Sequence, residues 1–261
     1  MFRYSYIIID FSEIEGLQAT FALLKSCGYA GVELNLTPDV LNRLDEIETT
    51  VAANSLVVPA LLTGAAYEDG LCLSSPDPGI RELTVERLKS YLDVASRFDA
   101  ILVVGLLQGL RSDEADPVVA NQRIAACLRE VGHAALEVGV EFVIEPVNHL
   151  QVGFNNSLAE VQQLIAEIDV PVFKPMLDTI HMNIEETSLT EPVYRCGESL
   201  RHVHLCESNA GLFGAGRIDF KSVLDALNSV GYEGFASVKV YRNANLEEAI
   251  RSSIEFLRTG S

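Results

Sequence analysis

The sequence is poor in positive charge and lacks the cysteine spacing of a metal-binding or disulfide framework. Lysine and arginine number 19 against 37 aspartates and glutamates, so the formal charge of −18 would repel phosphate backbones and anionic lipids. The 5 cysteines are widely spread and contain no CxxC pair, which argues against structural zinc and a disulfide framework. Neither nucleic acid nor a membrane surface is therefore an expected partner.

Long apolar runs are also absent. No stretch approaches the roughly 20 residues needed to span a bilayer. The N-terminal sequence MFRYSYIIIDF has an apolar run too short for a signal sequence and no small-residue cleavage site after it. We therefore expect a soluble, cytoplasmic protein. With 261 residues and 48% hydrophobic composition, the chain can bury a large core, and we expect one domain over residues 1–261.

Apolar, β-branched segments alternate with helical patterns along the whole chain, which is typical of a parallel sheet covered on both faces. Strands are predicted at residues 4–10, 31–35, 56–62, 100–105, 141–146, 172–178, 201–206 and 234–241. Between them, Ser157 to Glu160 has the spacing of a capping box, and glycines such as Gly28 end helical patterns. Eight βα units predict a single (β/α)8 TIM barrel, whose site lies at the C-terminal ends of the strands. The alternative is a doubly wound open sheet, although no GxGxxG follows the first strand.

The last four predicted strands carry acid, base or metal-ligand side chains near their C-terminal ends. Glu145 lies in an apolar strand, where an unpaired carboxylate is costly to bury unless a metal or cation neutralises it. Asp178 ends the next strand, and His181 follows one helical turn later. Strand alternation puts His202 and His204 on one face. Either could be a core histidine, but His204 lies nearer the strand end, which favours a ligand role.

Glu145, Asp178 and His204 offer oxygen and nitrogen donors, a set that suits Mn²⁺, Mg²⁺ or Co²⁺ better than structural zinc. Lys239 lies between apolar residues of the last strand, where a lysine is expensive unless paired, and the two carboxylates are its expected counter-ions. The buried ion pair could also substitute for a metal. Asn148 lies in the loop after Glu145, where polar side chains line a pocket.

On the stretches VIEPVNH (143–149), MLDTIHMNIEE (176–186) and HVHLCESNAGLFGAGRIDF (202–220), the chain resembles the xylose isomerase-like TIM-barrel superfamily. The resemblance is strongest to its D-tagatose 3-epimerase branch of sugar and sugar-phosphate isomerases and epimerases. It implies a divalent metal, usually Mn²⁺, held at the positions of Glu145, Asp178, His204 and a fourth glutamate, which is Lys239 here. It also implies sugar contact by a histidine at position 181.

Three positions depart from the family pattern at the substrate. Besides Lys239, Gln151 replaces a sugar-binding glutamate, and Ala210 replaces an arginine. In the family's epimerases, the first and last glutamates act as paired bases on opposite faces of an enediolate, while the metal polarises the carbonyl and hydroxyl groups. With Lys239 in the last position, only Glu145 remains as a carboxylate base.

The resulting hypothesis is a metal-assisted sugar isomerase or epimerase with Glu145 as the base and Lys239 as a cationic acid or enediolate stabiliser. A lyase acting on an oxidised sugar, or a catalytically inactive barrel that binds a sugar or a protein partner, are the alternatives. The expected substrate is a small sugar, uncharged or singly phosphorylated, since Arg217 and Lys239 are the main cations expected at the rim. The resemblance implies a homodimer or homotetramer. The related DNA-repair endonucleases need histidines on earlier strands, and this chain has none before His133.

Overall fold

A computed structural model describes residues 2–11, 14, 16–242 and 245–259. Within these residues, parallel strands form a closed barrel in sequence order, and the last strand pairs with the first. The strands are β1 (Arg3–Ile8), β2 (Gly31–Asn35), β3 (Ala60–Leu62), β4 (Ile101–Val104), β5 (Phe142–Ile144), β6 (Phe173–Asp178), β7 (His202–Cys206) and β8 (Phe235–Lys239). The predicted (β/α)8 barrel is confirmed, and the open doubly wound sheet is wrong.

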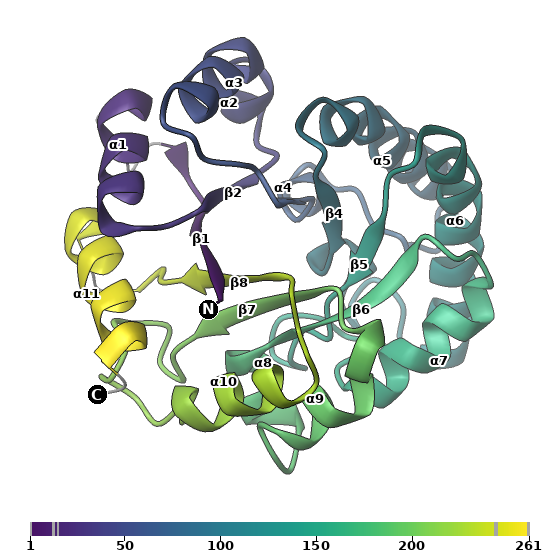
Figure 1. Cartoon of the computed structure of the whole chain (residues 1–261). Coiled ribbons are helices and arrows are strands. Elements are labelled where there is room, and N and C mark those ends of the chain that lie inside the picture. The colour runs from purple at the N-terminus through teal and green to yellow at the C-terminus, as the bar shows by residue number, and fades with distance from the viewer. Residues whose placement is uncertain (1, 12–13, 15, 243–244, 260–261) are drawn as a thin grey trace.

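Helices surround the barrel on its outer side (Figure 1). They are α1 (Leu17–Cys27), α2 (Pro38–Leu41), α3 (Leu44–Ala53), α4 (Ala65–Glu68), α5 (Pro78–Phe98), α6 (Pro117–Val138), α7 (Leu158–Ile168), α8 (Thr179–Glu185), α9 (Glu191–Cys196), α10 (Phe220–Ser229) and α11 (Leu246–Thr259), with short 3₁₀ turns η2 (Leu106–Gln108) and η3 (Gly197–Ser199). The first and last long helices, α1 and α11, lie side by side and complete the ring. In the part of the chain described, no helix is long and apolar enough to cross a bilayer.

The predicted strands are all present, and most are shorter than the apolar runs that predict them. In the third, the regular strand starts at Ala60, because Pro59 has no N–H to donate and only Val57 forms an isolated bridge before it. The capping box and the glycine stop predicted from the sequence are both present. The Ser157 side chain accepts the Glu160 N–H in a full capping box, and Gly28 follows α1 in the left-handed region with φ 91°.

The barrel interior has an apolar side and a polar side. Ala60, Ile101, Val103, Val143 and Met176 form a small buried cluster of their own on β3 to β6, separate from the large core between strands and helices. Polar and charged side chains are buried at interior positions of the remaining strands and at the end of β6, namely Ser5, Glu33, Asp178, His202, His204 and Ser237. The polar half of the interior is therefore formed by β1, β2, β7, β8 and the end of β6.

Candidate active site

The side chains at the C-terminal ends of β5 to β8 converge at one rim of the barrel. Glu145 directly follows β5, Asp178 ends β6, His204 lies in β7 and Lys239 ends β8. The strand register places Asp178 beside His204. The side chains of Asp178 and His204 are 0% exposed, that of Glu145 is 7% exposed and that of Lys239 is 12% exposed. Four predicted site residues are thus brought together in a nearly closed space.

Three of these side chains offer donors at the spacing of a metal site. His204 Nδ1 lies 3.2 Å from Glu145 Oε1 and 3.6 Å from Asp178 Oδ2. Ligand bonds of about 2.1 Å set neighbouring donors roughly 3 Å or slightly more apart, and carboxylate and imidazole are donors that divalent metals accept. Glu145, Asp178 and His181 also group within 4.8 Å of one another. A candidate site for a divalent metal is therefore present.

The orientation of Asp178 follows from its place at the junction of β6 and α8. Its Oδ1 accepts the Ile180 N–H at 3.0 Å and caps α8. The other oxygen, Oδ2, faces His204 and Lys239. The sequence pattern of a strand ending in aspartate thus fixes both the start of the helix and the direction of the donor atom.

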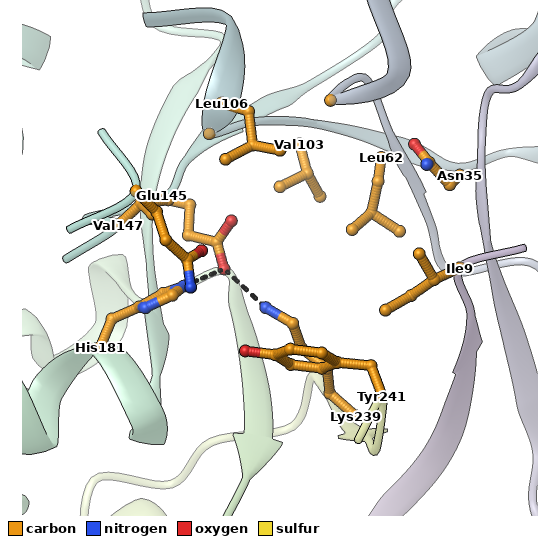
Figure 2. Close-up of a pocket in the computed structure, with 13 residues that line it drawn as sticks. Ile9, Asn35, Leu62, Val103, Leu106, Glu145, Val147, His181, Lys239 and Tyr241 are labelled. Carbon is orange, nitrogen blue, oxygen red and sulfur yellow. Dashed lines mark ion pairs between the residues drawn. The ribbon is translucent and has the colours of Figure 1, made fainter. Parts of the chain in front are cut away.

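Lys239 is the cation among these carboxylates. Its Nζ lies 2.8 Å from Asp178 Oδ2 and 3.7 Å from Glu145 Oε1, and Figure 2 shows it reaching toward Glu145. Burial would lower the pKa of Lys239, but the two carboxylates outweigh burial and raise the pKa above its ordinary value. Burial would likewise raise the pKa of Asp178, but Lys239, His181 and His204 hold it well below its usual range. The ion pair expected from the sequence is present.

His181 presents a hydrogen-bond donor to the same space. Asn148 Nδ2 lies 2.7 Å from His181 Nδ1, so the amide donates to that nitrogen and the proton of the neutral ring is assigned to Nε2. This Nε2 faces Glu145 Oε1 at 3.7 Å and Asp178 Oδ2 at 3.8 Å. Burial is the main reason that the pKa of His181 is lowered, so the ring is neutral at neutral pH. Asn148 acts here on His181 and does not itself line the cavity.

A cavity of about 170 Å³ opens beside these residues (Figure 2). Its polar wall consists of Glu145, Gln151, His181, Lys239 and Tyr241, and its other lining residues include Ile9, Asn35, Leu62, Val103, Gly105, Leu106 and Val147. Figure 2 shows the apolar side chains of Ile9, Leu62 and Val103 across the space from the polar wall. Among the described lining residues, Lys239 is the one lysine or arginine.

Gly105 lets Glu145 approach the end of β4. A Cβ atom at position 105 would come within 2.7 Å of Glu145 Oε2, closer than real Cβ contacts. The Glu145 backbone is held as well, since its carbonyl accepts a hydrogen bond from Gln108 Nε2 at 3.2 Å, and Asn155 Nδ2 donates to Gln108 Oε1 at 2.9 Å. The carboxylate therefore has a fixed position, with Oε1 toward His204 and Oε2 toward Gly105.

Other predicted residues lie at different distances from the cavity. Gln151 lines it, as does Tyr241. Arg217 is exposed and does not line it, because the Glu207 carboxylate holds the backbone N–H of Arg217 at 2.8 Å within the loop after β7. His202 points to Glu33 in the barrel interior, with Nε2 2.8 Å from Oε1. It is a hydrogen-bonded core histidine in this arrangement.

Two residues of the site region were not predicted from the sequence. Tyr241 lies in the cavity wall, with the Lys239 ammonium 5.8 Å from its ring centre. It is two positions after Lys239, so strand alternation was a usable signal for it. Glu33 accepts hydrogen bonds from His202 and His204 and is completely buried. The sequence signal for Glu33 was the same as for Glu145: a single glutamate in an apolar strand is a buried carboxylate that needs a partner.

The sequence and the fold are similar to those of several known proteins. A family model described as "Xylose isomerase-like TIM barrel" matches residues 21–260. Ketose 3-epimerase of Arthrobacter globiformis is 27% identical over 226 residues, which cover 85% of this chain and 76% of the relative. The 3-dehydro-D-guloside 4-epimerase of Escherichia coli (strain K12) is 24% identical over 258 residues, which cover 94% of this chain and 95% of the relative.

A crystal structure of 3-keto-D-glucoside 4-epimerase from E. coli, in its apo form, has a TM-score of 0.86 to this structure. The two are 20% identical, over 99% of this chain and 100% of the other, so this likeness concerns the fold. The sequence relatives are sugar epimerases, which confirms the expected enzyme class of sugar isomerases and epimerases. The family resemblance read from the sequence is also confirmed.

Proposed function

Because the chain belongs to the xylose isomerase-like TIM-barrel family, we propose that it moves a proton next to the carbonyl of a sugar through an enediolate. The observation that carries this proposal is the convergence of Glu145, Asp178, His204 and Lys239 at one small cavity. Relatives named as 3-epimerases and a 4-epimerase support the same class of reaction.

We propose Mn²⁺ as the cofactor, held by Glu145, Asp178 and His204, whose donors have the required chemistry and spacing. When bound, the ion would polarise the substrate's carbonyl and hydroxyl oxygens and offset the negative charge that develops on them. Mg²⁺ and Co²⁺ suit the same donors.

The chain's own side chains divide the work of proton transfer. Glu145 removes the proton from carbon, since its Oε2 lies beside Gly105 in the cavity wall. His181 donates its Nε2–H to a sugar oxygen and orients the ring. Lys239 stabilises the oxyanion that forms when the proton leaves. With one carboxylate base, an isomerisation, or removal and return of a proton with the help of Lys239, follows more directly than inversion between two carboxylates.

The proposed substrate is a small sugar without a phosphate group. Phosphate recognition usually employs arginine or several N–H donors, whereas Lys239 is the one lysine or arginine among the described lining residues and is already paired. We propose Gln151 and Tyr241 as further sugar contacts at the cavity, while Arg217 is exposed outside it. From the sequence alone, we also propose that the protein acts in the cytoplasm and forms a homodimer or homotetramer.

A second candidate is favoured by the Lys239 ion pair itself. An ammonium 2.8 Å from Asp178 Oδ2 already neutralises part of the charge that a metal would neutralise. A barrel that works without metal, either as a lyase on an oxidised sugar or as a sugar-binding protein without catalysis, is consistent with that contact. The two candidates differ in metal content and in proton exchange.

Exchange of carbon-bound hydrogen in D₂O tests the proposed function. Wild-type protein loaded with Mn²⁺ is incubated with a panel of unphosphorylated ketoses, the ion is then chelated, and the proton spectrum of each sugar is recorded. We expect exchange at one carbon next to the carbonyl, and its loss in Glu145→Gln. The matched control is Glu141→Gln, which changes a carboxylate at the opposite end of the same strand that pairs with Arg201 at 2.6 Å. Exchange that persists in Glu145→Gln would refute the role of Glu145.

A further inference from the structure

A buried polar cluster lies directly beneath the candidate metal site. Glu33 on β2 is its centre, and Ser5 on β1, Ser237 on β8 and both histidines of β7 surround it. All of these residues are at most 1% exposed. The proposed reaction does not use Glu33, Ser5 or Ser237, so the cluster requires another explanation.

The Glu33 carboxylate divides its two oxygens between the two histidines. Oε1 lies 2.8 Å from His202 Nε2, and it also accepts hydrogen bonds from Ser5 and Ser237. Oε2 lies 3.1 Å from His204 Nε2. The serines and His202 therefore hold one oxygen, which leaves the other directed at His204.

The His204 ring connects this cluster to the site. Its Nε2 contacts Glu33, and its Nδ1, on the opposite side of the ring, lies 3.2 Å from Glu145 Oε1 and 3.6 Å from Asp178 Oδ2. With Glu33 accepting the Nε2–H, Nδ1 is the ring nitrogen left to face the other two donors. In metal sites, a carboxylate that accepts the second N–H of a ligating histidine fixes both the tautomer and the ring orientation.

A purely structural role is a poor account of Glu33. Burying a carboxylate is expensive even when it is hydrogen-bonded, and apolar residues of similar volume often serve barrel cores at lower cost. Apart from Asp178, the buried interior cluster on β3 to β6 is apolar and consists of Ala60, Ile101, Val103, Val143 and Met176. The buried Glu33 carboxylate lies on the side of the barrel interior from which it contacts His204.

We propose that Glu33 is a positioning residue that holds His204 with Nδ1 toward Glu145 and Asp178, and that it acts on metal binding through this ring. The part that concerns metal binding rests on the proposed function. His202, Ser5 and Ser237 keep the Glu33 carboxylate in place and do not act on the metal themselves.

The test compares Glu33→Gln and Glu33→Asp with His202→Gln, using variants with the wild-type circular dichroism spectrum. Glu33→Gln removes the charge, and Glu33→Asp keeps the charge but shortens the reach to His204. His202→Gln replaces the ring in the same cluster by an amide that can still donate to Glu33 Oε1, so the contact between Glu33 and His204 is kept. Mn²⁺ affinity is measured from the EPR signal of the free ion, and the ring nitrogens of the metal-free protein are followed by ¹⁵N NMR after histidine labelling.

We expect wild-type protein to bind one Mn²⁺ per chain, both Glu33 variants to bind it about 10- to 100-fold more weakly, and His202→Gln to resemble wild type. In metal-free protein, the exchange-protected Nε2–H signal of His204 should be lost or strongly shifted in both Glu33 variants only. Unchanged Mn²⁺ affinity and an unchanged His204 signal in a Glu33 variant would overturn the proposal. So would two Mn²⁺ per chain, since Glu33, His202 and His204 would then be ligands of a second ion.

If wild-type protein binds no Mn²⁺, the proposed cofactor is wrong, and the His204 signals alone decide whether Glu33 positions the ring. The two failures are therefore distinguishable.

Discussion

Lys239 places a cation among the side chains that would hold a metal. In the metal-free protein, Asp178 and Glu145 hold it as an ammonium and raise its pKa. A divalent ion bound to the same carboxylates would repel that ammonium and compete for their charge, which favours the neutral amine. At the residue scale, the reaction thus depends on whether Lys239 remains a cation beside the substrate or becomes a ligand.

Substitution of Lys239 separates these roles. We predict that Lys239→Met abolishes the native reaction without unfolding the barrel, because the oxyanion loses its cationic partner while a similar volume is kept. Lys239→Glu should restore the four-ligand set of the family, tighten Mn²⁺ binding and raise any ketose 3-epimerase activity. Steady-state rates and Mn²⁺ titrations measure both effects. Full activity of Lys239→Met on the native substrate would mean that the lysine is only a structural counter-ion.

The stability of the fold at low pH should depend on the ion pair between Lys239 and Asp178. A carboxyl group with a depressed pKa in the folded state stabilises the fold above its unfolded pKa of about 3.9, and this contribution is lost as the pH falls through the folded value. Burial would raise the pKa of Asp178, and Lys239 is the first of the groups that lower it. We therefore predict that metal-free Lys239→Met unfolds at a higher pH than wild type.

Circular dichroism during acid titration measures this midpoint. The control is Lys221→Met, which removes an exposed lysine paired with Asp225 on α10 and should leave the midpoint near the wild-type value. Coincident midpoints for wild type and Lys239→Met would show that the lysine does not depress the Asp178 pKa.

At the scale of single elements, the helix caps set where the barrel's helices begin. Ser157 and Glu160 satisfy each other's backbone N–H groups at the start of α7, which follows the site loop after β5. Replacement of a capping serine by alanine costs about 1 kcal/mol. We predict that Ser157→Ala lowers the melting temperature by about 2–4 °C for a chain of this size, with little effect on catalysis.

Thermal unfolding followed by circular dichroism tests this prediction. Ser252→Ala is the matched control, because Ser252 lies inside α11 and donates only to the Glu248 carbonyl one turn earlier. Alanine there should be neutral or slightly stabilising. A loss of stability in Ser252→Ala equal to that in Ser157→Ala would remove the cap as the explanation.

The sequence predicts the elements better than it predicts their contacts. Apolar, β-branched segments between helical patterns, together with glycine stops, locate every strand. A carboxylate or histidine near a strand end is a strong signal because burial is costly there, as for Glu145 and Asp178. The contact between Glu33 and His204 joins β2 to β7, which are far apart in sequence and meet only across the closed barrel. No local pattern reports such a pairing. Arg217 was expected at the rim but does not line the cavity. The direction of a side chain in a loop depends on the fold of that loop, which the sequence pattern does not give.

At the scale of the whole molecule, closure of the barrel through β1 and β8 brings the first and last strands together, and we propose on this basis that residues 1–261 are one domain. The net charge of −18 opposes the approach of polyanions. We predict that a DNA duplex carrying an abasic site does not bind, as measured by fluorescence anisotropy at low salt with Mn²⁺ present. Tight, salt-dependent binding would contradict the assignment to sugar chemistry.

The metal content of the purified protein shows whether Glu145, Asp178 and His204 hold a divalent ion. Metal-free wild type, Asp178→Asn and the control Asp219→Asn, which changes the exposed cap of α10, are each equilibrated with Mn²⁺, separated from free ion and assayed by elemental analysis. We predict about one Mn²⁺ per chain in wild type and Asp219→Asn, and strongly reduced occupancy in Asp178→Asn, because an anionic ligand is lost. Equal occupancy in wild type and Asp178→Asn, or no bound Mn²⁺ in either, would contradict it.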